Sequence, residues 1–153
     1  MSGIQFALKS GRPAPIPPAA GRVFAGIAMA QILIADDEEG FRFLLKRMLE
    51  TSGHEVREAA DGDAAIAALR TFPAQVAIVD LFMPGREGIE TIMEIRRRHP
   101  DTKIIAISGG APKTGSSFLG MAQKLGAHRA LNKPFSADEL LVLVSHLIEP
   151  DTP

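Results

Sequence analysis

Short apolar runs alternate with amphipathic helical patterns along most of this chain, and no other feature of the sequence restricts its fold as strongly. Five runs have the length of β-strands, three of them dominated by Ile, Leu and Val: Gln31–Ala35, His54–Ala59, Val76–Asp80, Lys103–Ser108 and Arg129–Asn132. Continuously apolar strands are typical of a parallel sheet that is covered on both faces. The sequence therefore predicts an α/β fold with a doubly wound, five-stranded parallel sheet.

The segments between these runs have the period of helices. The first segment carries one apolar stripe, and Gly53 closes it; the stripe consists of Phe41, Leu44, Leu45, Met48 and Leu49. The other predicted helices are Asp61–Phe72, Glu87–Arg98, Ser116–Leu125 and Ser136–Ile148. Ser136 and Glu139 have the spacing of a capping box, in which two side chains satisfy free backbone N–H groups at a helix start. Five βα units thus follow one another.

The two ends of the chain differ from this pattern. Residues 1–28 are rich in Pro, Gly, Ala and Arg without any period, so we expect a disordered arm, or an upstream start codon before a natural start at Met29. Residues 29–149 form the predicted domain, and residues 150–153 form a short tail. We therefore expect a stand-alone domain that carries no output module of its own.

Composition excludes several classes of protein. The formal net charge of −1 gives no basic surplus, which argues against nucleic acid as a partner. No apolar run reaches the roughly 20 residues of a membrane-spanning helix, so no membrane partner is expected. The chain has no cysteine, which excludes disulfides and thiolate chemistry and is compatible with a cytoplasmic location.

Polar residues that could bind a ligand or take part in a reaction lie at the ends of the predicted strands. Asp36 and Asp37 come after the first strand, Asp80 ends the third, Ser108 ends the fourth and Lys133 follows the fifth. In a doubly wound sheet, ligands bind outside the carboxyl ends of the strands. Three carboxylates, a hydroxyl and an ammonium at one rim suit Mg²⁺ together with a phosphoryl group. The four histidines, His54, His99, His128 and His146, lie away from these strand ends.

Four motifs at these strand ends carry a family resemblance. The segments "IADDEEG", "VDLFMPGREG", "AISGG" and "LNKPFS", in this order, are similar to the receiver domain of bacterial response regulators. The resemblance covers about Gln31 to Ile148. It implies a flavodoxin-like (βα)5 fold with strand order 2-1-3-4-5, and a phosphoacceptor module of a two-component phosphorelay that is not an enzyme apart from Mg²⁺-dependent self-phosphorylation and self-dephosphorylation.

The resemblance also implies a role for each matching residue. Asp80 is expected to accept a phosphoryl group from a histidine kinase or a histidine phosphotransfer protein, and the change is then passed to a downstream protein. Asp37 and Asp80, with the backbone carbonyl of Phe82, are expected to hold Mg²⁺, while Asp36 acts mainly through water. The cation offsets the repulsion between an anionic nucleophile and an anionic phosphoryl group.

Lys133 and Ser108 complete the set that the resemblance implies. Lys133 is expected to pair with the phosphoryl oxygens and to precede a cis peptide bond to Pro134. Ser108 supplies the hydroxyl that moves toward the phosphoryl group. The chain departs from the family pattern at the residue that usually responds to phosphorylation. Ala130 stands where the fifth strand usually has an aromatic residue, and the chain contains no tyrosine.

Two other functions use a similar sheet. A phosphohydrolase or phosphotransferase with an aspartyl nucleophile has a carboxylate two residues beyond it, where this chain has Phe82, which cannot transfer a proton. A flavodoxin-like ligand-binding protein needs a glycine-rich phosphate loop after the first strand, whereas the loop here is acidic. Both are less compatible with the sequence than the phosphoacceptor.

Overall fold

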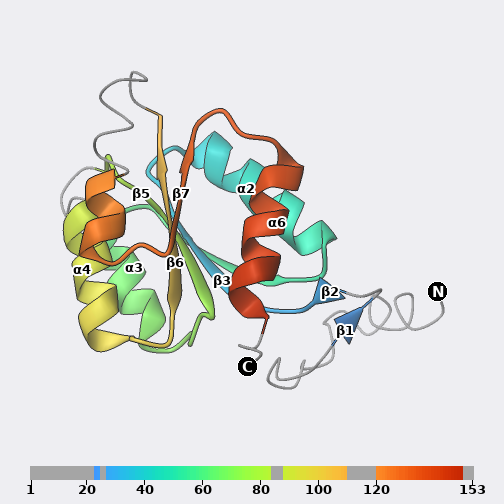
Figure 1. Ribbon diagram of the computed structural model, residues 1–153, viewed down its shortest axis with the longest axis horizontal. Helices are drawn as coiled ribbons and strands as arrows, with labels where there is room; N and C mark the ends of the chain where they lie inside the picture. Colours follow the sequence, from blue (N-terminus) through green and yellow to red (C-terminus); the bar gives the residue numbers. More distant parts are fainter. Residues whose placement is uncertain (1–22, 25–26, 84–87, 110–119, 150–153) are drawn as a thin grey trace.

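The computed structural model describes residues 23–24, 27–83, 88–109 and 120–149. Its centre is a five-stranded parallel sheet with the order β4-β3-β5-β6-β7 (Figure 1). The strands are β3 (Gln31–Ala35), β4 (Glu55–Ala59), β5 (Val76–Asp80), β6 (Lys103–Ser108) and β7 (Arg129–Asn132). Counted within this sheet alone, the order is 2-1-3-4-5, which confirms the prediction.

Burial explains why these strands were visible in the sequence. Every residue of β5 is buried, and β3 and β6 are buried except at their first residue, since helices cover both faces of the sheet centre. The edge strand β4 alternates between exposed and half-buried residues before its buried last residue, Ala59. The predicted start of β4 at His54 is wrong by one residue, because the chain enters the ladder at Glu55.

Helices cover both faces of the sheet (Figure 1). On one face lie α2 (Glu39–Thr51) and α6 (Ala137–Ile148), which bury Leu45, Leu49, Leu140 and Val144 against the sheet. On the other face lie α3 (Gly62–Leu69), α4 (Gly88–Arg98) and a helical segment at residues 120–125. The result is three layers with two apolar cores, as expected of a doubly wound sheet.

Three predicted helix boundaries shift within the described residues: Asp61 and Ser136 are N-caps rather than first helical residues, and α3 ends before Phe72. Asp61 is the N-cap of α3 and accepts the Ala64 N–H at 2.8 Å, and the helix ends at Leu69 rather than at Phe72. Phe72 is buried in the core and precedes Pro73, and the residue before a proline is disfavoured in a helix, so the helix does not extend through Phe72. Residues 116–119 of the fourth predicted helix and residue 87 of the third lie outside the described residues.

Two predicted helix signals are confirmed. Gly53 follows α2 with a φ of 97°, a left-handed conformation that glycine adopts without strain, and its N–H donates to the Glu50 carbonyl. Ser136 and Glu139 form the capping box that begins α6: the Ser136 hydroxyl accepts the Glu139 N–H at 3.1 Å, and the Glu139 carboxylate accepts the Ser136 N–H at 2.9 Å.

Most of the N-terminal 28 residues lie outside the described part of the chain. Within this segment, β1 (Val23–Phe24) and β2 (Ile27–Ala28) pair as a short antiparallel ladder, and the expectation of a disordered arm or an upstream start over residues 1–28 stays a prediction. The boundaries at 29–149 and 150–153 stay predictions. Among the described residues, no helix has both the length and the apolar content needed to cross a bilayer.

Two histidines lie at the amino-terminal edge of the sheet, one immediately before β4 and one immediately before β7. His54 is buried, and its Nδ1 accepts the Ala30 N–H at 3.1 Å. His128 Nδ1 accepts the Ile104 N–H at 3.0 Å. Burial lowers the pKa of both imidazoles, and the nearby cations Lys103, Arg96 and Arg129 lower that of His128 further. Both rings therefore serve as neutral acceptors that hold backbone amides.

Candidate functional site

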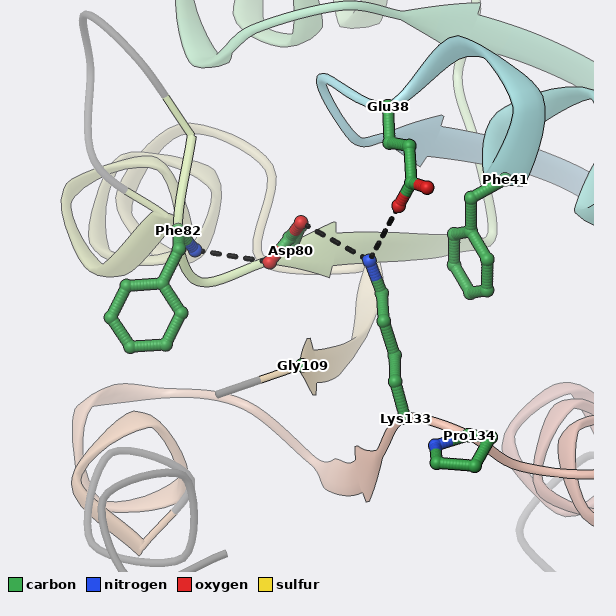
Figure 2. Close-up of a pocket in the computed structure, with 7 residues that line it drawn as sticks. All are labelled: Glu38, Phe41, Asp80, Phe82, Gly109, Lys133 and Pro134. Carbon is green, nitrogen blue, oxygen red and sulfur yellow. Dashed lines mark hydrogen bonds and ion pairs between the residues drawn. The ribbon is translucent and has the colours of Figure 1, made fainter. Parts of the chain in front are cut away.

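The carboxyl ends of the central strands bring the predicted site residues to one rim. Asp36 and Asp37 follow β3, Asp80 is the last residue of β5, Ser108 is the last residue of β6, and Lys133 directly follows β7. In a parallel sheet all these ends lie on the same side, so side chains far apart in sequence converge. Figure 2 shows Asp80 and Lys133 pointing toward one another in the resulting pocket.

Three carboxylates form a cluster in this rim. Oxygens of Asp36, Asp37 and Asp80 all lie within 4.8 Å of one another. Asp36 is 0% and Asp80 5% exposed, whereas Asp37 is open to solvent. Such a cluster of hard oxygen donors, two of them withdrawn from water, matches the donor set of a divalent cation such as Mg²⁺.

Asp36 is held by groups around it. Its Oδ1 accepts the Glu38 N–H at 2.8 Å, and its backbone carbonyl accepts from Arg42 Nη1 at 2.7 Å. Arg42 is itself fixed by an ion pair with Glu58 at 3.1 Å. Asp36 Oδ2 is buried and forms no well-directed hydrogen bond among the described residues, although Lys133 Nζ lies 3.1 Å away. A buried oxygen with spare acceptor capacity fits a role toward a cation or a cation-bound water.

Lys133 is the cation of the acidic cluster. Its Nζ lies 3.1 Å from Asp36 Oδ2, 3.5 Å from Asp80 Oδ2 and 3.8 Å from Glu38 Oε1. Burial works to lower the pKa of Lys133, but the closely spaced carboxylates of Asp36 and Asp80 outweigh it and raise the pKa above its ordinary value. The ammonium is thus charged at neutral pH and lies where an anionic group would be bound.

Asp80 has a fixed orientation and an unfavourable environment for its charge. Its Oδ1 accepts the Phe82 N–H at 3.0 Å, which sets the rotation of the carboxylate. Burial and the charge of Asp36 raise the pKa of Asp80 to about 6, although the Phe82 hydrogen bond and Lys133 act in the opposite direction. Burial is the largest of these effects, so a cation close by would restore the ionised form.

Ser108 and Phe82 lie at the same rim. The Ser108 side chain is fully buried, and its carbonyl accepts the Lys133 N–H at 2.8 Å, which links the ends of β6 and β7. Phe82 is 41% exposed. The peptide bond between Lys133 and Pro134 is cis, as predicted. The metal role of the Phe82 carbonyl and the movement of the Ser108 hydroxyl stay predictions.

A pocket of about 660 Å³ opens above Asp80. Its described lining consists of Glu38, Phe41, Asp80, Phe82, Gly109, Lys133 and Pro134 (Figure 2). The sequence reasoning missed Glu38 and Phe41, which come from the start of α2 rather than from a strand end. It assigned Phe41 to the buried stripe of that helix. The positions of Glu38 and Phe41 in the sequence could have predicted that they line the pocket. The first turn of the helix that follows β3 lies beside the residues at the end of β3.

Comparison with known proteins gives the same family as the motifs. The sequence pattern described as "Response regulator receiver domain" matches residues 32–145. The nitrogen assimilation regulatory protein NtrX of Azorhizobium caulinodans is 34% identical over 121 residues, which cover 77% of this chain and 26% of that protein. The sensor kinase CckA of Brucella abortus is also 34% identical, over 78% of this chain and 13% of its own length. The chain thus spans about a quarter or less of these curated relatives.

Solved structures match the fold closely. The receiver domain of NtrX from Brucella abortus has a TM-score of 0.72 and 31% identity, covering 78% of this chain and 99% of that one. The chemotaxis protein CheY4 of Vibrio cholerae has a TM-score of 0.69 and 29% identity, covering 79% of this chain and 100% of that one. With the sheet order, the acidic cluster and the family match in agreement, the chain belongs to the response regulator receiver domain family, the phosphoacceptor modules of two-component signalling.

Proposed function

We propose that Asp80 is the residue of this receiver domain that accepts the phosphoryl group, and that Asp36, Asp37 and Lys133 serve that transfer. One observation carries the proposal: three carboxylates and the Lys133 ammonium, from the ends of β3, β5 and β7, meet at one rim of the sheet. Asp80 is the only member of this set, within the described residues, that lines the pocket and is also oriented by a backbone N–H.

The transfer is a substitution at phosphorus. A carboxylate oxygen of Asp80 forms a bond to phosphorus while the bond from phosphorus to the donor nitrogen or oxygen breaks. The leaving group keeps that electron pair and takes a proton from solvent. The hydrogen bond from Phe82 to Oδ1 keeps the carboxylate from rotating, so the nucleophile starts close to its reactive orientation.

Lys133 stabilises the charge that develops during this step. Its Nζ is 3.5 Å from Asp80 Oδ2, so a phosphoryl group attached to Asp80 would bring its oxygens within reach of the ammonium. A preorganised cation near the equatorial oxygens lowers the barrier because that charge is greatest in the transition state. The raised pKa keeps the ammonium protonated throughout.

A divalent cation completes the proposed site. Asp37 and Asp80, with the Phe82 carbonyl, would hold Mg²⁺, and Asp36 would act through bound water. When bound, Mg²⁺ supplies Lewis-acid stabilisation of the phosphoryl oxygens. The buried Asp36 Oδ2 and the closely spaced carboxylates support this assignment.

This chemistry also suggests which protein donates the phosphoryl group and which kind of molecule responds to the phosphorylated domain. We propose a phosphohistidine of a histidine kinase or of a histidine phosphotransfer protein as donor, a cytoplasmic location, and a protein as the downstream target. The relative named DNA-binding transcriptional regulator NtrC, from Azospirillum brasilense, is a longer protein, of which this chain spans 26%. The expected absence of a nucleic-acid partner therefore stays a prediction for this chain.

The first test is phosphorylation by a small donor. With Mg²⁺ and acetyl phosphate, intact-mass measurement should show one added phosphoryl group on the wild type, and Asp80→Asn should show none, because an amide is not a nucleophile under these conditions. Removal of Mg²⁺ with a chelator should abolish labelling of the wild type.

A matched control separates this site from nonspecific labelling. Asp101 is an exposed aspartate in the loop before β6, at the opposite edge of the sheet, so Asp101→Asn should be labelled like the wild type. Labelling of Asp80→Asn at the wild-type level would refute the assignment.

A further inference from the structure

The Lys133 ammonium has an aromatic neighbour as well as its carboxylates. Lys133 Nζ lies 4.1 Å from the centre of the Phe41 ring, over its face. Figure 2 shows the Phe41 ring beside the lysine head, on the side away from Phe82. At this distance the negative face of the ring attracts the cation. Phe41 has no part in the function proposed above, so this contact needs its own explanation.

The Phe41 ring is itself held in place. It meets Phe135 edge to face, with ring centres 5.8 Å apart and planes at 83°. It also packs against the apolar core between α2 and the sheet. Phe135 lies two residues after Lys133, so the same ring contacts both the head of the lysine and the segment that follows the lysine. A ring supported in this way is a rigid seat for the ammonium.

Three carboxylates compete for the Lys133 ammonium, so a group that fixes the position of the ammonium is useful. Asp36, Asp80 and Glu38 all lie within 3.8 Å of Lys133 Nζ, and Glu38 has a side chain that is 68% exposed. A flexible lysine stem allows the ammonium to follow any of them. The ring face attracts the charge without adding an acceptor oxygen, so the ammonium is located near Asp80 while its three N–H donors stay available to oxygens.

We propose that Phe41 is a positioning residue for Lys133, holding the ammonium at the place from which it meets the phosphoryl oxygens. The inference rests on the proposed role of Lys133 in phosphoryl transfer. Phe41 acts through Lys133, since Lys133 is the group that reaches the phosphoryl oxygens. Loss of the ring face should therefore slow phosphorylation only in a chain that still has the lysine.

Three variants test the ring face. Phe41→Leu keeps an apolar side chain but removes the ring, and the maximal rate of labelling by acetyl phosphate at saturating Mg²⁺ should fall by about two- to thirty-fold, the range expected for a cation–π contact. Phe41→Tyr keeps the ring face and should restore most of the rate. Trifluorophenylalanine introduced at position 41 keeps the shape of the ring but weakens the negative potential of its face. Its labelling rate should lie between the rates of Phe41→Leu and Phe41→Tyr.

The matched control is Phe43→Leu, the same substitution two residues along the same helix. Phe43 is 58% exposed, and its ring carries the more distant Arg47, at 5.9 Å. Phe43→Leu should keep the wild-type rate. Each variant is checked for folding by thermal unfolding. If Phe41→Leu does not fold, the fluorinated ring alone decides the question, and a wild-type rate there overturns the proposal.

A double-mutant cycle shows whether Phe41 acts through the lysine. In Lys133→Met, which keeps the stem and removes the charge, adding Phe41→Leu should change the labelling rate no further. An equal fall in both backgrounds would overturn the proposal, because the ring would then act on packing alone.

A spectroscopic signal of the metal-free protein gives an independent readout. The ring current of Phe41 should shift the Cε methylene protons of Lys133 upfield, and this shift should vanish in Phe41→Leu and persist in Phe43→Leu. An unchanged Lys133 signal in Phe41→Leu would overturn the seat. Failure of the underlying function has a different signature, namely a wild type without phosphate or a labelled Asp80→Asn.

Discussion

Asp80 is placed where its own charge is disfavoured, and at the scale of a residue this carries a cost in stability. Burial and Asp36 raise its pKa to about 6 in the folded chain, from 3.8 in a model compound. Between these values the folded state binds more protons than the unfolded state, so the stability contributed by this group is present at low pH and is lost as the pH rises through 6.

Asp80→Asn should therefore stabilise the metal-free protein at pH 7.5. We expect a gain in the free energy of unfolding on the order of 1–2 kcal/mol, since a pKa unit corresponds to about 1.4 kcal/mol and the amide forgoes the attraction to Lys133. Urea unfolding followed by circular dichroism measures it. The gain should shrink at pH 4.5, and also with Mg²⁺, which binds the wild type more tightly. A less stable Asp80→Asn at pH 7.5 would contradict this account.

At the scale of an element, the start of α4 is fitted against the end of β5. A Cβ on Gly88 would overlap the backbone of Asp80 and Leu81, and the Gly88 N–H donates to the Leu81 carbonyl at 3.2 Å. The helix thus begins in direct contact with the strand that ends in the proposed phosphoacceptor. A side chain at this position would have to push one of the two elements away.

Gly88→Ala should destabilise the fold by about 1–3 kcal/mol, the usual cost of overpacking. The control is Gly40→Ala in α2, where a Cβ would meet nothing within 4 Å, so the change should be neutral or stabilising by up to about 1 kcal/mol. Chemical unfolding of both variants beside the wild type gives the comparison. Equal stability of the two variants would contradict this account, because it would show that the backbone of Asp80 and Leu81 can move to accept a Cβ at position 88 without loss of stability.

The elements also show how far the sequence alone could lead. The buried strands β5 and β6 were predicted at their observed bounds, because an apolar run bounded by polar residues has few alternatives in an α/β chain. The rim residues followed, since each one ends or directly follows a strand. Phe41 was assigned to the core stripe of its helix, because a helical period identifies a face but gives no information about which neighbour the first residue of that face touches.

At the scale of the whole molecule, stability against acid should depend on the edge of the sheet opposite the pocket. Burial lowers the pKa of His54, which accepts the Ala30 N–H as a neutral ring. The unfolded chain then binds more protons than the folded chain as the pH falls below about 6.5, so stability is lost in that range. One extra proton taken up on unfolding changes the free energy of unfolding by about 1.4 kcal/mol per pH unit.

His54→Asn should flatten this dependence, because asparagine offers an acceptor oxygen that does not titrate in this range. The unfolding free energy that is lost between pH 7.5 and 5.5 should be smaller for His54→Asn than for the wild type, since the opposite contribution of Asp80 is the same in both. His146→Asn, at an exposed position in α6, should keep the wild-type difference. An unchanged pH dependence in His54→Asn would exclude this imidazole as the source.

The two histidines at one edge and Asp80 at the other give the sheet two separate responses to acid. At the rim of the metal-free protein, a proton on Asp80 neutralises the proposed nucleophile and removes a buried charge, so it does not weaken the fold. At the far edge, a proton on His54 or His128 removes the acceptor of a backbone amide and weakens the fold itself. A loss of labelling in acid therefore has two causes, protonation of Asp80 and unfolding of the chain. A variant with asparagine in place of His54 and His128 would report the protonation of Asp80 alone.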